Sequence, residues 1–426
     1  MTRPPSSPRG ARPTAAVLIA LATALAAQAV DWPQFGGASR DFVLEVRDDA
    51  AALAPSWPEA GPAVAWKREL GTGYSGIAVV GDTLYTAYRR GDDEVVLAAA
   101  TATGETRWEH RYAAPFASYM SMEHGAGPHT TPLVVGGRVF VAGIGGRLMA
   151  LDAATGRELW RKELIDDLGG TPMDRGYASS PLAYRGNVVV SVGGRGQGVV
   201  AFDQETGARS WASGDFDGSF SSPFVIELGG DDQLVLFTSK GVVGLDPEGK
   251  ETLWSHPHPT QYDLNISVPL WIPHSENAGV LFVSSAYDGG SRALRLTNEG
   301  DRTRVEELWA HKEMRLHISN AIHVDGVVYA SSGDFGPVPM TAVDLASGDI
   351  LWRDRAVARA NLVRVGNDLL FLDEDGMLHL GRASRDRLQI RSQVDLFTTR
   401  TWTGPTVVAK RLYARDQAHL VALDLP

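Results

Sequence analysis

The chain contains no cysteine, and this absence excludes several kinds of site. Without thiols there is no disulfide, no zinc–thiolate centre, no haem attached through a CxxCH motif and no lipid-modified N-terminal cysteine. The chain has 426 residues, of which 44% are hydrophobic, so it is long enough to be stabilised by core burial alone. We therefore expect a folded protein without covalent cross-links.

Basic clusters and long apolar runs are also missing. The formal net charge is −11, and no run of Lys and Arg interrupts it. Proteins that bind nucleic acid need clustered cations against the phosphates, so nucleic acid is not an expected partner. After residue 30 no segment approaches the ~20 apolar residues that span a bilayer.

The first thirty residues carry a targeting signal. Three arginines (Arg3, Arg9 and Arg12) precede an uncharged Ala/Leu-rich stretch, and small residues at 27–29 offer a cleavage site before Val30. We predict a Sec-type signal peptide over residues 1–29, with a membrane anchor as the alternative. The mature protein is then periplasmic or extracellular and has no membrane span.

A repeat dominates the rest of the chain. The segments ALDAATGRELW (150–160), AFDQETGARSW (201–211) and AVDLASGDILW (342–352) share one pattern, and residues 98–108 and 244–254 are weaker copies. The tryptophans of the pattern lie 42 to 55 residues apart, which is the length of a four-stranded propeller blade. They are Trp66, Trp108, Trp160, Trp211, Trp254, Trp309 and Trp352.

Each position of the repeat has a structural reason. A strand ends at an aspartate (Asp152, Asp203 or Asp344), whose carboxylate can accept backbone N–H groups in an Asx-type turn. The glycine that follows can adopt the positive φ of a tight turn. The next strand carries the tryptophan, a large apolar side chain suited to packing between blades.

Eight such units can be counted, and the last one is incomplete. Residues 406–425 stop after their aspartate, while the missing strand is present at the other end of the chain as VAWKREL (64–70). We therefore predict an all-β protein, a single eight-bladed β-propeller over residues 63–426 with four-stranded blades. Strand 64–70 completes the last blade and closes the ring, so that no wide sheet edge stays open.

Residues 30–62 precede the closing strand and include the motif DWPQFGG (31–37). We predict an extended segment packed on the propeller surface through Trp32 and Phe35, with Pro33 and the two glycines shaping its turn.

The AxDxxTGxxxW repeat resembles that of the pyrroloquinoline-quinone (PQQ) repeat propellers. This family includes quinoprotein alcohol dehydrogenases and the outer-membrane-assembly propeller lipoprotein. The chain looks closest to an exported branch with a similar opening, DWPQFGG, and similar segments YASSP (177–181), SFSSP (219–223), DLNISVP (263–269) and TWTGPTVVAKRLYARD (401–416). The resemblance implies the propeller fold over essentially the whole mature chain.

The family's activities do not follow in the same way. Its dehydrogenases carry adjacent cysteines beside the quinone, a calcium ion held by carboxylates and an amide, and a catalytic aspartate. This chain has no cysteine, and no motif matches the calcium set. PQQ with calcium is thus an open alternative and not an expected cofactor, and the catalytic residues stay unknown.

Candidate ligand-binding residues follow from the propeller itself. The loop that leads into each inner strand opens at one mouth of the central channel, and its polar residues can meet there. The alternative is that these groups cap strand ends and bind channel water. The predicted set is Tyr74, His124, His129, Arg175, Tyr177, Ser179, Asn265, His317, Asn320, Arg400 and Trp402.

Two histidine-containing segments need separate interpretation. EHGAGPH (123–129) holds three potential metal ligands, but its glycines and proline indicate a polar loop, and we predict no metal site. HPH (256–258) follows a repeat tryptophan and reads as a solvated turn.

The sequence favours a binding or protein-interaction scaffold with its ligand site at the channel mouth over an enzyme. The alternative is a divergent PQQ-dependent oxidoreductase that acts on alcohols or sugars. The expected partner is an unidentified protein or a small polar ligand, and the expected state is a monomer.

Overall fold

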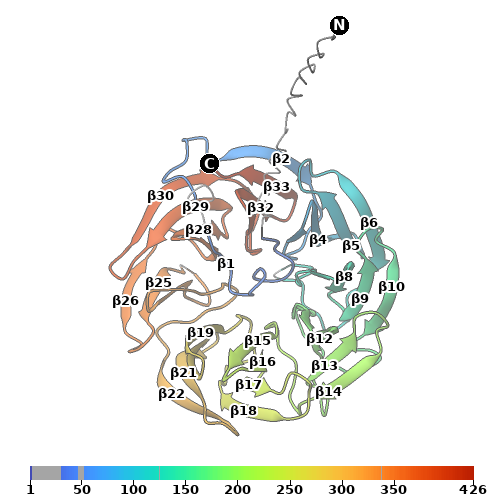
Figure 1. Ribbon diagram of the computed structural model, residues 1–426, viewed down its shortest axis with the longest axis vertical. Helices are drawn as coiled ribbons and strands as arrows, with labels where there is room; N and C mark the ends of the chain where they lie inside the picture. Colours follow the sequence, from blue (N-terminus) through green and yellow to red (C-terminus); the bar gives the residue numbers. More distant parts are fainter. Residues whose placement is uncertain (2–29, 47–51, 124, 337) are drawn as a thin grey trace.

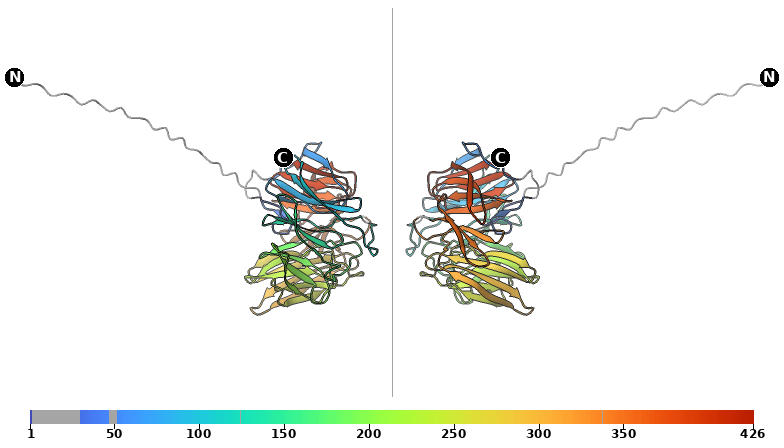
Figure 2. Two further views of the ribbon diagram at one scale, coloured as in Figure 1. Left: turned by 90° about the vertical axis from the view of Figure 1, so that its right-hand side faces the viewer. Right: turned by 90° about the vertical axis from the view of Figure 1, so that its left-hand side faces the viewer.

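The computed structural model describes residues 1, 30–46, 52–123, 125–336 and 338–426. Eight sheets of antiparallel strands form a ring around a central channel, and the described residues contain no α-helix (Figure 1). The predicted eight-bladed β-propeller is confirmed. Figure 2 shows the ring edge-on, with the blades side by side.

Seven blades consist of four strands that follow one another in the chain, from the channel outward (Figure 1). In order these are β3 (Ala78–Val80), β4 (Thr83–Arg90), β5 (Asp93–Ala100), β6 (Thr106–Ala113); β7 (Leu133–Val135), β8 (Arg138–Ala142), β9 (Arg147–Asp152), β10 (Glu158–Glu163); β11 (Leu182–Tyr184), β12 (Asn187–Ser191), β13 (Val199–Asp203), β14 (Arg209–Ser213); β15 (Phe224–Leu228), β16 (Asp231–Phe237), β17 (Gly241–Leu245), β18 (Thr252–Pro257); β19 (Leu270–Ser275), β20 (Ala278–Ser285), β21 (Gly290–Asn298), β22 (Thr303–His311); β23 (Ile322–Val324), β24 (Val327–Ser331), β25 (Met340–Asp344), β26 (Ile350–Asp354); and β27 (Ala360–Val365), β28 (Asp368–Asp373), β29 (Met377–Ala383), β30 (Leu388–Asp395).

The eighth blade joins the two ends of the chain. It contains β31 (Thr406–Val408), β32 (Arg411–Arg415) and β33 (His419–Asp424), and its outer strand is β2 (Ala63–Glu69). β2 pairs antiparallel with β33, with Trp66 opposite Ala422. The predicted ring closure is confirmed.

The repeat motif docks a blade onto the next at five positions around the ring. Asp152 Oδ1 accepts from the Thr155 amide at 2.9 Å and from the Thr155 hydroxyl at 2.8 Å, and the same turn recurs at the other two repeat aspartates. Trp108 of the preceding blade donates its indole N–H to the Ala153 carbonyl at 2.9 Å. Its ring lies against Gly156. Four further repeat tryptophans donate to the matching carbonyl: Trp66, Trp160, Trp309 and Trp352.

Hydrophobic clusters fill the spaces between neighbouring blades. One joins blades two and three and includes Phe140 and Phe202. The largest spans the seam between blades seven, eight and one, and it contains Trp32, Trp57 and Trp66. Because each cluster belongs to two or more sheets, no blade has a complete core of its own.

Residues 32–44 of the N-terminal segment lie inside the ring, which differs from the surface position that we expected, whereas Trp57 and Gly61 lie against β30, the outer strand of blade seven. Trp32 forms a β-bridge with Val79 at the end of β3, and β1 (Val43–Leu44) pairs parallel with the end of β27. Figure 1 shows β1 and the blue chain before it within the circle of blades. The physical reason is that the inner strands carry unpaired backbone groups, which this segment satisfies.

No helix in the described part of the chain has the length and apolar character needed to cross a bilayer. The predicted signal peptide, residues 1–29, falls outside the described residues apart from Met1.

Candidate functional site

A cavity of about 1020 Å³ occupies the centre of the ring. The loops that lead into the inner strands supply most of its lining, and the loops between the second and third strands of three blades supply the rest. In an antiparallel blade these two kinds of loop share one face, so the cavity opens at that face. The volume is at the upper end of the range typical of small-molecule pockets.

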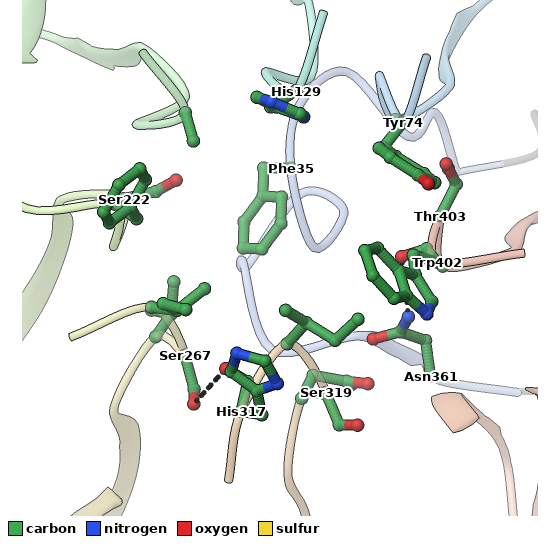
Figure 3. Close-up of a pocket in the computed structure, with 18 of the residues that line it drawn as sticks. Phe35, Tyr74, His129, Ser222, Ser267, His317, Ser319, Asn361, Trp402 and Thr403 are labelled. Atoms are coloured by element: carbon green, nitrogen blue, oxygen red, sulfur yellow. Dashed lines mark hydrogen bonds between the residues drawn. The ribbon is translucent and has the colours of Figure 1, made fainter. Parts of the chain in front are cut away.

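The N-terminal segment provides the floor of this pocket. Trp32, Phe35 and Phe42 line it, and Figure 3 shows Phe35 in the middle of the surrounding side chains. Phe35 and Phe42 meet edge to face with their ring centroids 5.1 Å apart. Residues 32–44 pair with the far ends of β3 and β27, so they cross the channel at the end opposite the mouth.

Arg40 anchors this floor. Its side chain is only 8% exposed and donates from Nη1 to the Pro181 carbonyl at 3.1 Å and to Gln34 Oε1 at 3.0 Å. Burial lowers the pKa of Arg40 to about 9. The guanidinium also lies over the Phe35 ring, 5.8 Å from its centroid.

One wall of the pocket is a stack of rings. Tyr74 lies between Trp402, at a centroid distance of 5.1 Å, and His129, at 5.9 Å, with interplanar angles of 29° and 12°. Arg400 covers the Trp402 ring at 4.6 Å. Protein atoms surround His129 so closely that the loss of water lowers its pKa to about 4, and it is neutral at pH 7.

The opposite wall, from blades five and six and the loops before them, is a second aromatic group. The Tyr287 hydroxyl and His317 Nε2 are hydrogen-bonded at 2.6 Å. Tyr262 and Phe335 pack against Tyr287, with centroids 5.4 and 6.3 Å from its ring. These two side chains remain 59% and 71% exposed, so they lie at the mouth.

Charged groups alternate around the lining. Arg175 lies 3.8 Å from Glu123 and 3.7 Å from Asp174. Arg359 lies 3.7 Å from Glu374, whose Oε2 also accepts from the Trp402 indole at 3.0 Å. With Arg400 the described lining contains three guanidinium groups and three carboxylates, so its formal charge is zero.

The hydroxyl and amide groups deeper in the channel connect neighbouring inner strands. The amide of Thr131 donates to Ser180 Oγ at 3.0 Å, and that of Ser180 donates to Ser222 Oγ at 2.9 Å. Asn320 bonds the Leu362 carbonyl and amide at 2.9 and 2.8 Å. These groups therefore cap the ends of strands, as in the alternative that the sequence left open for the polar residues of the channel mouth.

The structure brings seven of the predicted site residues together and separates three from them. The pocket is lined by Tyr74, His129, Arg175, His317, Asn320, Arg400 and Trp402. Tyr177, Ser179 and Asn265 are buried behind its surface. The Tyr177 hydroxyl donates to the Ser191 carbonyl and the Asn265 amide donates to the Thr238 carbonyl, because these loops must satisfy their own backbone. His124 lies outside the described residues.

Sequence reasoning missed Phe35 on the floor, Tyr287, Phe335 and Glu374 on other loops, and Tyr262 and Arg359 on loops that lead into inner strands. Tyr287, Phe335 and Glu374 follow second strands of their blades. The signal was available, since the loop after a second strand reaches the same face as the loop before a first strand.

A cluster of side chains of the kind that holds a metal ion, three or more of Asp, Glu, His or Cys, is not found among the described residues. The sequence also lacks the cysteine pair.

The comparisons with known proteins agree with the propeller fold. Residues 92–267, less than half of the chain, match the family described as outer membrane protein assembly factor BamB. The *Yersinia pestis* protein of that name is 25% identical over 297 residues, which are 68% of this chain and 72% of that protein. The quinohemoprotein alcohol dehydrogenase of *Comamonas testosteroni* is 37% identical over 92 residues, 21% of this chain but only 13% of the enzyme. The chain is thus similar in sequence to PQQ-repeat propellers of two kinds, an assembly factor and a dehydrogenase.

Solved structures support the propeller fold. BamB from *Moraxella catarrhalis* superposes with a TM-score of 0.59 at 18% identity, covering 85% of this chain and 99% of that one. The *Comamonas testosteroni* dehydrogenase superposes with a TM-score of 0.64 at 15% identity, covering 93% and 80%. At these identities the likeness carries the fold and no activity.

Proposed function

We propose that this propeller is an exported binding scaffold whose ligand site is the channel-mouth pocket. The observation that carries the proposal is the pocket itself. It is a cavity of about 1020 Å³ between two aromatic walls, and the N-terminal segment forms its floor. Rigid walls and pre-placed polar groups lower the entropic cost of binding. The expected state is a monomer located in the periplasm or outside the cell, with its N-terminus at Val30 after signal cleavage.

A divergent quinoprotein dehydrogenase is the second candidate function. It is favoured by the 37% identity to the *Comamonas testosteroni* enzyme over 92 residues. The lack of the family's cysteine pair counts against it, and no catalytic step is assigned to the pocket.

Titration with PQQ and Ca²⁺ separates the two functions. We expect no saturable change in quinone absorbance and no dye reduction when ethanol or glucose is added. We also expect small polar ligands from a thermal-shift screen to raise the melting temperature of the protein but not that of Trp402→Ala. Micromolar PQQ binding followed by substrate-dependent dye reduction would replace the scaffold with the dehydrogenase.

A further inference from the structure

Two aromatic surfaces face each other across the pocket, four blades apart in the ring. Tyr74 and Trp402 come from the loops at blades one and eight, and Tyr262 and Tyr287 come from the loops at blade five. Tyr and Trp rings have apolar faces and polar edges, so a ligand between them must be partly apolar in its body and polar at its rim.

The charges narrow the ligand class further. Three carboxylates disfavour an anion, and three guanidinium groups disfavour a cation. A hydroxyl group both donates and accepts hydrogen bonds, so it can pair with either kind of side chain. A neutral ligand that carries many hydroxyls therefore uses the whole rim without an electrostatic penalty.

The bonded backbone groups and the size of the cavity disfavour two other kinds of ligand, an extended peptide and a single small ring. The inner-strand groups that an extended peptide would need are already bonded by the serine, threonine and asparagine side chains between blades and by the N-terminal segment. The cavity is larger than one small ring requires.

We propose that the pocket binds a neutral oligosaccharide, and this inference rests on the binding function proposed above. One sugar ring packs beside Trp402, between the Tyr74 wall and the floor at Phe35. A second ring reaches the mouth beside Tyr262. The sugar hydroxyls pair with the alternating arginines and carboxylates, Arg175 and Glu374 among them.

A glycan array of neutral and acidic oligosaccharides tests this directly with the full-length protein. We expect retention of neutral oligosaccharides of two or more rings. Trp402→Ala and Tyr262→Ala should each weaken binding about 5- to 10-fold, the loss expected for one aromatic contact. Tyr119→Ala is the matched control: Tyr119 is 44% exposed and does not line the pocket, so its loss should change affinity less than about 2-fold.

Several outcomes overturn the inference. Retention of acidic glycans alone contradicts the argument from charge. If the unmodified protein retains no neutral glycan more strongly than Trp402→Ala does, the proposed ligand class is wrong. Melting temperatures show whether each variant is folded, and Tyr262→Ala, at an exposed position, keeps the test valid if Trp402→Ala unfolds. A peptide or small aromatic ligand that binds in a Trp402-dependent way would leave the scaffold function standing, whereas redox activity with PQQ would remove both.

Discussion

At the scale of single residues, the contact between a repeat glycine and the tryptophan of the preceding blade can be tested at Gly156. Its φ is +71°, and an added Cβ would lie 2.5 Å from the Trp108 ring. Gly156→Ala combines backbone strain with overpacking, so we expect a loss of about 2–4 kcal/mol in the free energy of unfolding, measured from urea denaturation.

Gly186→Ala is the matched control for this prediction. Gly186 also has a positive φ, +79°, but nothing lies within 4 Å of its added Cβ. We expect only the backbone cost of about 1–2 kcal/mol. Equal losses for the two variants would show that the contact with the indole contributes nothing to stability.

Individual residues also show where sequence reasoning succeeds and fails. Asp152 could be assigned to a turn because its partners are two and three residues away. His258 reads as part of a solvated turn, yet it is fully buried and accepts from Arg292 Nε at 2.9 Å. Its partner is 34 residues distant, and no local pattern encodes such a contact. Burial, with Arg292 nearby, lowers the pKa of His258 to about 3.

At the scale of elements, the N-terminal segment is a part of the propeller and not an appendage to it. Its aromatic and glycine content predicted that it would pack, but not where, because the unpaired inner edges of β3 and β27 appear only once the ring is built. Its backbone accepts from the amides of Val79 at 2.8 Å, Val134 at 2.8 Å and Arg364 at 3.0 Å.

Removal of residues 1–51 should therefore expose these three amides while the closing strand β2 stays in place. We expect their hydrogen exchange to accelerate at least about 10-fold, because each loses its acceptor. The amide of Val189, in the middle of blade three, should keep its protection. Unchanged exchange at Val79, Val134 and Arg364 would mean that the segment does not hold this position in solution.

At the scale of the whole molecule, the sequence sufficed for the architecture but only partly for the site. The repeat specifies how most blades contact the next, so the ring follows largely from one local rule. The pocket depends instead on loops that differ from blade to blade, such as those carrying Tyr287 and Phe335. Their side chains meet across the channel only after the ring has closed. The sequence therefore predicted which face of the propeller carries the pocket, but it predicted fewer of the residues that line it.

The ring closes within blade eight, where β2 and β33 pair without a covalent link between them, and several further contacts join this blade to blade one. Arg415, fully buried on β32, donates to the carbonyls of Ala87 at 2.5 Å and Gly71 at 3.1 Å. Gln417 pairs with both backbone groups of Gly73. The outer strand of this blade, β2, depends entirely on non-covalent pairing with β33.

Deletion of residues 63–70 should consequently do more damage than the loss of eight residues from a loop. It leaves the edge of β33 unpaired and uncovers the cluster around Trp57 and Tyr413, and an open edge of this kind pairs with other chains. We expect a lower melting temperature and oligomers or aggregates in size-exclusion chromatography. Val64→Lys, at a position 58% exposed on the same strand, is the control and should remain a monomer with nearly unchanged melting. A deletion variant that behaves like this control would refute ring closure by β2 as a source of stability.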